Sequence, residues 1–327
     1  DVARFWLDRG VDGFRLDTIN FYFCDEELRD NPPLAPALRN SSIAPAVNPY
    51  NHQDHLYSKN QPENLPFLRK LRAVMQPYGA AAVGEVGDAQ RGLEILGQYT
   101  AGDDLMQMCY AFELLSGERP TPDSLADLFA HFDAVAGDGW ACWAFSNHDV
   151  VRHKTRWNLS DASERCFVTL LMCLRGSACI YQGEELGLAE ADVAFDDLQD
   201  PYGKEFWPEF KGRDGCRTPI VWEVSNRHGD FSDAPRTWLP VSPQHLRHSV
   251  SAAQNDPGSL VHHYRRAIAF RRAYAALRLG DMTRVSTDGD VFQFQRADAD
   301  QVIFCAFNLS NDARNVTLPP GNWQQIG

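Results

Sequence analysis

The sequence predicts an α/β fold, namely the C-terminal part of a TIM (β/α)8 barrel (about its last five strands) followed by the start of an antiparallel all-β domain. Two observations predict this fold. Up to residue 181, short apolar runs of strand length alternate with segments whose apolar residues recur at helical spacing, as in parallel sheets with helical crossovers. After Gly280 the helical spacing ends, and short β-rich runs separated by turns follow.

The first β/α unit begins with an amphipathic helix, which Gly10 is predicted to end. A short strand follows, in which Phe14 and Leu16 alternate with Arg15 and Asp17. Arg15 and Asp17 therefore point to one face, where the guanidinium keeps the carboxylate ionised at neutral pH. The strand is predicted to end in a charged, reactive pair.

Four further strand units follow, each with its helix. Between the first strand and the next helix lies a Pro- and Asn-rich segment at 18–62, which we interpret as a lid or a loop walling a site, because irregular segments of this length are usually functional. The first three barrel strands are expected upstream of Asp1, so we expect the chain to be an internal fragment of a longer protein. The predicted helices lie at 63–76, 89–99, 122–136 and 162–174, and the strands at 80–86, 105–112, 140–146 and 177–181.

After residue 186 the sequence pattern changes twice. Residues 187–259 are irregular, and a helix at 260–277 is predicted to close the barrel. Short strands are then predicted at 283–286, 291–296, 302–309 and 314–318. We therefore predict two domains, a partial catalytic barrel at 1–278 and a partial β-sandwich at 279–327.

Charge and cysteine content restrict the partners and the compartment. The formal net charge is −13, so nucleic acid and anionic membranes are not expected as partners. The eight cysteines show no C-x-x-C spacing, and several lie in apolar runs, which favours buried free thiols in a reducing compartment and predicts no zinc site and no cofactor. We expect a cytoplasmic protein with a neutral small-molecule substrate.

Three motifs place a carboxylate at the end of a predicted strand. In D-G-F-R-L-D the carboxylate is Asp17; an R-x-D pattern by itself is more often only an ion pair at a strand end, and the flanking Asp-Gly and the later motifs shift the interpretation. In V-G-E-V-G-D it is Glu85, at a position where a carboxyl group is expensive to bury unless it is used or paired, and where its pKa can rise as a general acid requires. In F-S-N-H-D it is Asp149, and its neighbour His148 is a candidate base, metal ligand, core histidine or hydrogen-bond donor to substrate. Together the three suggest glycosidic cleavage, which needs a nucleophilic carboxylate and a carboxylic acid.

Two further motifs are more ambiguous. Y-Q-G-E-E-L-G contains Glu184 and Glu185, and G-R-D-G-C-R-T-P contains Arg213 and Asp214. These charged residues are either surface ion pairs or part of a site.

The order and wording of these motifs resemble the alpha-amylase superfamily, glycoside hydrolase family thirteen, over nearly the whole chain. The resemblance implies Asp17 as nucleophile, Glu85 as general acid/base and Asp149 as the third carboxylate, which binds sugar hydroxyls and favours ring distortion. It also implies Arg15 and His148 as companions at the sugar site.

The motifs Y-Q-G-E-E-L-G and G-R-D-G-C-R-T-P are similar to those of the oligo-1,6-glucosidase and alpha-glucosidase branch of that family. This similarity implies Arg213 at the sugar site. It also draws attention to Thr18, since Val at this position tends to accompany alpha-1,6 cleavage and Ala or Thr alpha-1,4 cleavage. Ile19-Asn20-Phe21 stands where many members have Lys-His, which makes a long-polymer amylase a poorer fit. The family's calcium-loop region would lie upstream, so a structural calcium site is expected only there.

The resemblance therefore predicts a retaining, exo-acting alpha-glucosidase of maltose-like disaccharides and other short alpha-glucosides, with possible transglucosylation. The alternatives within the enzyme class are an oligo-1,6-glucosidase and a trehalose- or sucrose-active relative. A non-catalytic barrel homologue that binds or stabilises a partner is the alternative from another class, and the presence of all three carboxylates argues against it. Without the missing strands, this fragment by itself is expected to be inactive.

Overall fold

The computed structural model describes residues 1–115 and 117–326, which fall into two compact units. The first unit comprises Asp1–Gly117 and Ala130–Trp143, and the second comprises Glu118–Phe129 and Ala144–Gly327. The predicted domain boundary at residue 278 stays a prediction.

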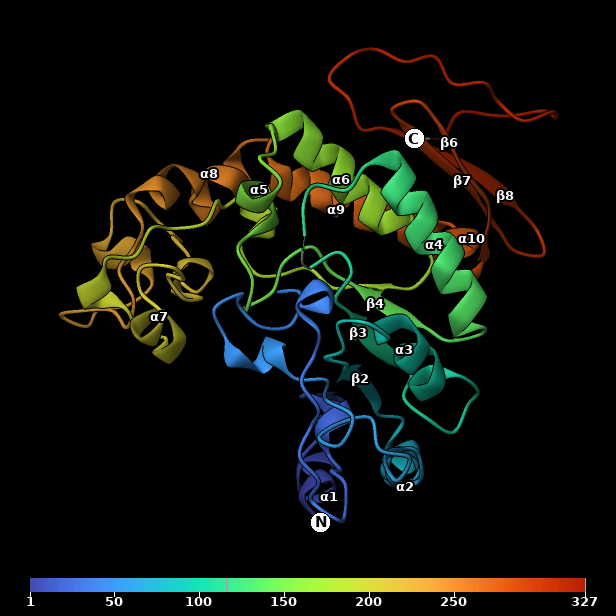
Figure 1. Cartoon of the computed structure of the whole chain (residues 1–327). Helices are drawn as coiled ribbons and strands as arrows, with labels where there is room; N and C mark the ends of the chain where they lie inside the picture. The colour runs from blue at the N-terminus through green and yellow to red at the C-terminus, as the bar shows by residue number, and fades with distance from the viewer. Residues whose placement is uncertain (116, 327) are drawn as a thin grey trace. The chain divides into compact units, whose positions relative to one another are not determined.

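The first unit is built on a parallel sheet. Strands β1, β2, β3 and β4 pair in chain order, and β2, β3 and β4 lie side by side in Figure 1. The run of small apolar residues in β2 suits an interior parallel strand, which is buried on both faces. The elements are α1 (Val2–Leu7), β1 (Gly13–Leu16), α2 (Asn64–Met75), β2 (Ala81–Glu85), α3 (Gly92–Thr100), β3 (Met108–Ala111) and β4 (Ala141–Trp143).

The apolar stripes of the helices supply the core of this unit. Leu68 and Met75, one face of α2, are fully buried, and Trp143 of β4 packs edge-on against Phe132 with ring centroids 5.4 Å apart. Helix α4 (Pro122–Ala136), which carries Phe132, has the bounds that its periodicity predicts. The positions of the predicted barrel helices and strands are confirmed to within a few residues.

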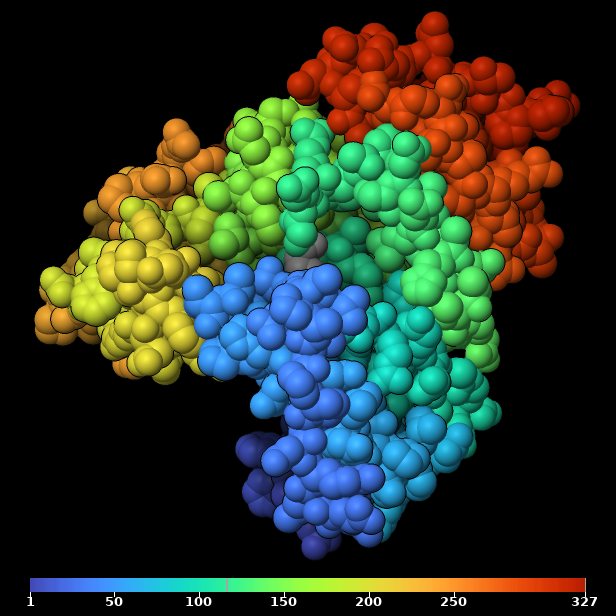
Figure 2. Space-filling model, viewed as in Figure 1, coloured from blue at the N-terminus to red at the C-terminus, as the bar shows by residue number. Residues whose placement is uncertain are grey.

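The segment at 18–62 is irregular, as predicted. It contains three short 3-10 turns, at Ile19–Phe21, Pro36–Leu38 and Pro49–His52, and a single β-bridge between Pro33 and Gln53. Its side chains form a contiguous blue area of the surface of the first unit in Figure 2.

The second unit combines helices with an antiparallel sheet. Strands β6, β7 and β8 pair in order, with an irregularity between Thr283 and Ser286 in β6. Buried Phe292 and Phe294 of β7 pack with tilted rings, whose centroids are 5.3 Å apart, and contribute to the core beside this sheet. The elements are α5 (His153–Arg156), α6 (Asp161–Cys173), β5 (Ser177–Ala178), α7 (Pro201–Glu205), α8 (Val250–Asn255), α9 (Leu260–Ala273), α10 (Ala275–Leu279), β6 (Asp281–Asp288), β7 (Val291–Ala297) and β8 (Val302–Asn308).

Several predictions of secondary structure in this unit are wrong. The predicted helix at 260–277 is two helices, because Tyr274 adopts an extended conformation at φ −114°, ψ 116°. The predicted strand at 314–318 does not form. These residues are exposed, and Arg314 bonds by its side chain to Asp290 at 2.8 Å, while no strand of the described chain pairs with this backbone. The short helices α5, α7 and α8 have too few residues to show helical periodicity.

Among residues 1–115 and 117–326, none of the helices has both the length and the apolar character that crossing a bilayer requires.

Candidate active site

The pairing of β1 with β2 brings two of the predicted carboxylates together. Leu16 lies opposite Gly84 in the parallel register, so the next residue along each strand, Asp17 and Glu85, occupies neighbouring positions at the same sheet edge. Polar side chains that follow parallel strands are thus gathered at one edge.

Arg15 bonds both carboxylates. Its Nη1 contacts Oδ1 of Asp17, and its Nη2 lies 2.9 Å from Oε2 of Glu85. The prediction that Arg15 and Asp17 share a face is confirmed. One planar guanidinium that contacts two carboxylates holds them close to each other, because its donors have a fixed spacing.

The two carboxylates differ in environment. The side chain of Glu85 is 7% exposed, whereas that of Asp17 is 73% exposed. Burial raises the pKa of Glu85, and the neighbouring Asp17 adds to the rise, although Arg15 and a hydrogen bond from the backbone oppose it. A buried carboxyl beside an exposed one is the arrangement that separates an acid from a nucleophile.

Thr18 contributes through its backbone. Its N–H donates to Oε2 of Glu85 at 3.1 Å. Thr18 has φ 40° and ψ 50°, in the left-handed region, which a β-branched residue rarely adopts. Such outliers gather at functional sites, where the surrounding structure holds them in place.

The second unit holds the third predicted carboxylate. Oδ1 of Asp149 accepts from Nη1 of Arg213 at 2.8 Å and from Nη2 of Arg217 at 3.0 Å, and its Oδ2 lies 3.2 Å from Nε2 of His148. Arg217 also donates from Nε to the His148 carbonyl at 2.7 Å. The predicted residues therefore form two clusters, Arg15, Asp17, Thr18 and Glu85 in the first unit and His148, Asp149 and Arg213 in the second.

Arg213 is anchored by a buried acid. It makes a two-pronged bond to Asp200, from Nε to Oδ2 at 2.9 Å and from Nη2 to Oδ1 at 2.8 Å. Burial would raise the pKa of Asp200, but the hydrogen bonds and charge of Arg213 lower it below its usual value. The interpretation of Arg213-Asp214 as a surface ion pair is wrong, because Asp214 is buried and accepts backbone N–H groups of Gln199 and Asp200.

Glu184 is buried as well, so a surface ion pair is also the wrong interpretation of this residue. Its Oε1 lies 3.3 Å from Nδ1 of His153, and the hydroxyl of Tyr264 donates to Oε2 at 3.4 Å. We assign this buried network to the packing of the second unit. The neighbouring Glu185 accepts the backbone N–H of Gly183 at 2.8 Å, which holds the turn.

Two residues near the carboxylates were not singled out by the motifs. Arg217 is the second Arg of G-R-D-G-C-R-T-P. It lies four residues after Arg213 in the same motif, and this proximity in sequence could have marked it as a residue of the same site. Tyr22 lies near Asp17, and the partial burial of its side chain, together with the charge of Asp17, raises its pKa. Nothing in the sequence around Tyr22 marks it.

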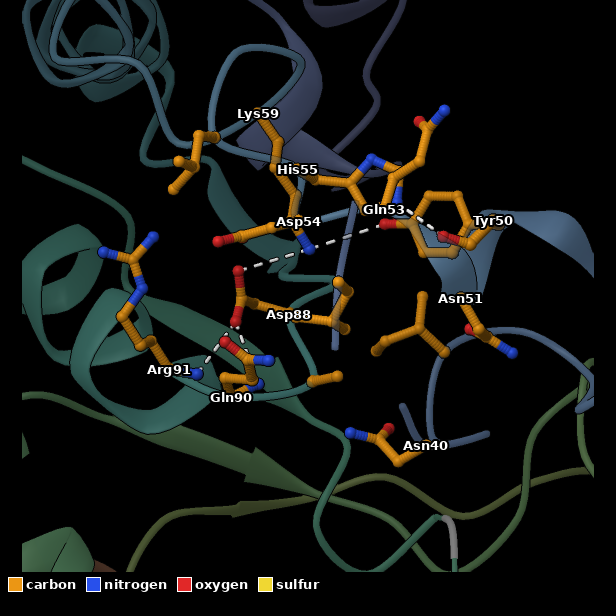
Figure 3. Close-up of a pocket in the computed structure, with 14 residues that line it drawn as sticks. Asn40, Tyr50, Asn51, Gln53, Asp54, His55, Lys59, Asp88, Gln90 and Arg91 are labelled. Atoms are coloured by element: carbon orange, nitrogen blue, oxygen red, sulfur yellow. Dashed lines mark hydrogen bonds and ion pairs between the residues drawn. The ribbon is translucent and has the colours of Figure 1, made fainter. Parts of the chain in front are cut away.

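A cavity of about 120 Å³ lies where segment 18–62 meets the loop that follows β2 (Figure 3). Tyr50 stacks on His55 in its wall, with ring centroids 3.8 Å apart. Lys59 pairs with Asp88 in the lining of the cavity, to which Arg91 also belongs (Figure 3). The loop at 18–62 thus walls a polar cavity beside the strand that carries Glu85.

In the part of the chain that the structure describes, no group of three or more His, Cys, Asp or Glu side chains is arranged to hold a metal ion. All eight cysteines are free thiols, five of them buried.

Comparison with known proteins agrees with the family resemblance of the motifs. Residues 1–280 match the family model described as alpha amylase, catalytic domain. The chain is 58% identical over 323 residues to a probable alpha-glucosidase of Rhizobium meliloti (strain 1021), covering 97% of this chain and 58% of the relative. It is 29% identical over 346 residues to an oligo-1,6-glucosidase of Halalkalibacterium halodurans, covering 94% of this chain and 58% of the relative.

Among solved structures, the crystal structure of the alpha-glucosyl transfer enzyme XgtA superposes with a TM-score of 0.92 at 47% identity, over 99% of this chain and 61% of that one. The chain therefore spans about three-fifths of the length of these relatives. The likeness confirms the predicted fold class, the C-terminal part of a TIM barrel followed by antiparallel β-structure.

Proposed function

The chain belongs to the alpha-amylase family of glycoside hydrolases, and on that premise we propose that the full-length protein is a retaining, exo-acting alpha-glucosidase of short alpha-glucosides, with alpha-1,4-linked maltose as the type substrate. The observation that carries the proposal is the bridge that Arg15 forms between the carboxylates of Asp17 and Glu85. Carboxylates that share one guanidinium are near neighbours. Retaining enzymes hold their two carboxyl groups about 5 Å apart, and inverting ones hold them about 6.5–9.5 Å apart to admit a water.

In the proposed mechanism Asp17 attacks the anomeric carbon while Glu85 protonates the leaving oxygen. Asp17 is the exposed member of the pair, so a sugar can reach it, and Arg15 contacts its Oδ1 and orients the carboxylate. Glu85 is buried, and its raised pKa favours the protonated form that a general acid needs. Glu85 then acts as a base, activating the water or alcohol that releases the glucosyl group from Asp17.

Asp149 is proposed as the third carboxylate, which accepts hydrogen bonds from sugar hydroxyls and favours ring distortion. The guanidinium groups of Arg213 and Arg217 both bond its Oδ1, which fixes the orientation of the carboxylate. His148, bonded to the other oxygen, is proposed as a donor to the same sugar.

The substrate class follows from the relatives and from Thr18. A probable alpha-glucosidase shares 58% of its aligned residues with this chain, which supports terminal glucose as the sugar that is recognised. The solved relative is an alpha-glucosyl transfer enzyme, which supports transfer to alcohols beside hydrolysis. Thr18, next to the nucleophile, favours alpha-1,4 linkages.

We expect the full-length protein to release glucose from maltose and from p-nitrophenyl alpha-glucoside faster than from isomaltose. Proton NMR during the first turnovers on maltose is expected to show alpha-glucose before mutarotation, because two displacements restore the configuration. Glucose that appears first as the beta anomer would contradict retention. A protein inert on all three substrates would contradict the alpha-glucosidase and favour the non-catalytic alternative.

Replacing Thr18 with Val is expected to shift linkage preference toward alpha-1,6. The change keeps the side-chain volume and removes a hydroxyl beside the nucleophile, so we expect the ratio of kcat/KM for isomaltose to that for maltose to rise about 10-fold. Thr283→Val, at an exposed position on β6, is the matched control and should leave the ratio unchanged. An unchanged ratio in Thr18→Val would remove Thr18 from the determinants of linkage.

A further inference from the structure

A buried hydrogen-bonded cluster joins the residue three positions after Asp17 to the residue two positions after Glu85. Asn20 is fully buried, and its side-chain amide forms a two-point contact with the peptide of Gly87. Asn20 Nδ2 donates to the Gly87 carbonyl at 3.1 Å, and the Gly87 N–H donates back to Asn20 Oδ1 at 3.1 Å. The side chain of Asn20 thereby holds the backbone that follows β2 by two hydrogen bonds.

The far end of segment 18–62 completes the cluster. The ammonium group of Lys59, with 8% of the side chain exposed, donates to the Gly87 carbonyl at 3.0 Å and to Asp88 Oδ2 at 3.2 Å, and it lies 3.4 Å from the Tyr50 hydroxyl (Figure 3). These three partners use its three protons. Asn60 bonds to residues of both segments, the one after β1 and the one after β2. It accepts from Asn20 at 2.9 Å and donates to Asp88 at 2.7 Å.

Apolar packing also holds the turn after β1 against β2. Ile19 is fully buried against Gly84, where an added Cβ would lie 2.3 Å from the Ile19 Cδ1. A larger residue at position 84 would displace the Ile19 side chain, so the turn after β1 lies directly on β2. The bond from the Thr18 N–H to Glu85 is made within the same turn.

We propose that Asn20, Lys59 and Asn60 form a positioning clamp that sets the separation of Asp17 and Glu85. The inference rests on the proposed function, in which these two carboxylates act on opposite sides of one glycosidic bond. Reactions of this kind tolerate little displacement, since a misplacement of about 1 Å costs on the order of 10²-fold in rate. Arg15 contacts the carboxylates themselves, whereas the clamp holds the backbone that carries them. Asn20 and Lys59 are buried, Asn60 is half-buried, and all three are hydrogen-bonded, as the rigid support of a precise site requires.

The test compares Asn20→Ala with Asn31→Ala in the full-length protein. Asn31 is the matched control, because among the described residues its amide bonds only Ser58 and Tyr57, both within segment 18–62. We expect Asn20→Ala to lower kcat on maltose about 10- to 100-fold with less than a threefold change in KM. We also expect it to move the basic limb of the pH profile, which reports Glu85. Asn31→Ala is expected to change none of these.

Hydrogen exchange measured by mass spectrometry supplies a readout that is independent of activity. Asn20→Ala is expected to speed exchange in peptides covering both 17–23 and 85–91, and Lys59→Met in 85–91, whereas Asn31→Ala and the exposed-surface change Lys70→Met should not do so. A folded Asn20→Ala protein with wild-type kcat and an unmoved pH profile would overturn the clamp, and so would unchanged exchange at 85–91. If the wild type hydrolyses no glucoside, the proposed function fails, and the exchange data still decide whether the clamp joins the two strand ends.

Discussion

Asp17→Asn in the full-length protein is expected to lower kcat on maltose by roughly 10⁴-fold or more, as removal of a nucleophile does in other enzymes that use covalent catalysis. The amide keeps the size of the side chain but is neutral and a poor nucleophile. Arg15 retains its bond to Glu85, so the local fold is expected to survive. Steady-state kinetics on maltose and on p-nitrophenyl alpha-glucoside measure the effect. We expect kcat to fall by a similar factor on both substrates, because a better leaving group does not compensate for a missing nucleophile.

Asp12→Asn is the matched control for this variant. Asp12 belongs to the same D-G-F-R-L-D stretch, but its side chain is exposed and it stands before β1, not after it. We expect its kcat to stay within about threefold of wild type, as is typical of surface substitutions of this kind. Equal losses in the two variants would mean that charge in this stretch supports folding. Equal retention would mean that Asp17 is not the nucleophile.

Periodicity was sufficient to predict the elements that lie in the sheet and against it. The bounds of α4 agree with its periodicity, and β2 was visible as an apolar run that ends in Glu85. The pattern failed where conformation depends on partners distant in sequence. Tyr274 breaks a helix without a Gly or Pro to mark the break, and the backbone at 314–318 has β-like composition but no strand beside it among the described residues.

In the candidate site, too, local patterns predict some contacts, whereas others depend on residues distant in sequence. Alternation alone predicts that Arg15 and Asp17 share a face, because it depends on two residues of one strand. The bridge from Arg15 to Glu85 depends on the register of β1 and β2, which no local pattern contains. In the sequence, Asn20 was notable only because Ile19-Asn20-Phe21 stands where many members of the family have Lys-His. Its contact with Gly87 spans 67 positions of the chain and is visible only in the fold.

Glu85→Gln is expected to separate the two halves of the reaction. Glutamine cannot donate an acidic proton, so we expect kcat on maltose, whose leaving group is a poor one, to fall about 10²- to 10⁴-fold. p-Nitrophenol leaves without protonation, so its release should begin quickly. Removal of the glucosyl group from Asp17 would then be slow, because it needs Glu85 as a base. A burst of p-nitrophenol and a protein heavier by one glucosyl group, detected by mass spectrometry, are the expected observations.

The pH profile gives the second test of Glu85. Its pKa is raised by burial, so the protonated acid persists to higher pH than an exposed glutamate would allow, and wild-type activity should fall as pH rises through that raised pKa. Glu85→Gln has no such proton to lose, and its residual activity should lack this basic limb. Glu63→Gln, at an exposed position before α2, should keep both the rate and the limb. If the limb persists in Glu85→Gln, another group is the acid. If the burst also appears with Asp17→Asn, the adduct is not on Asp17.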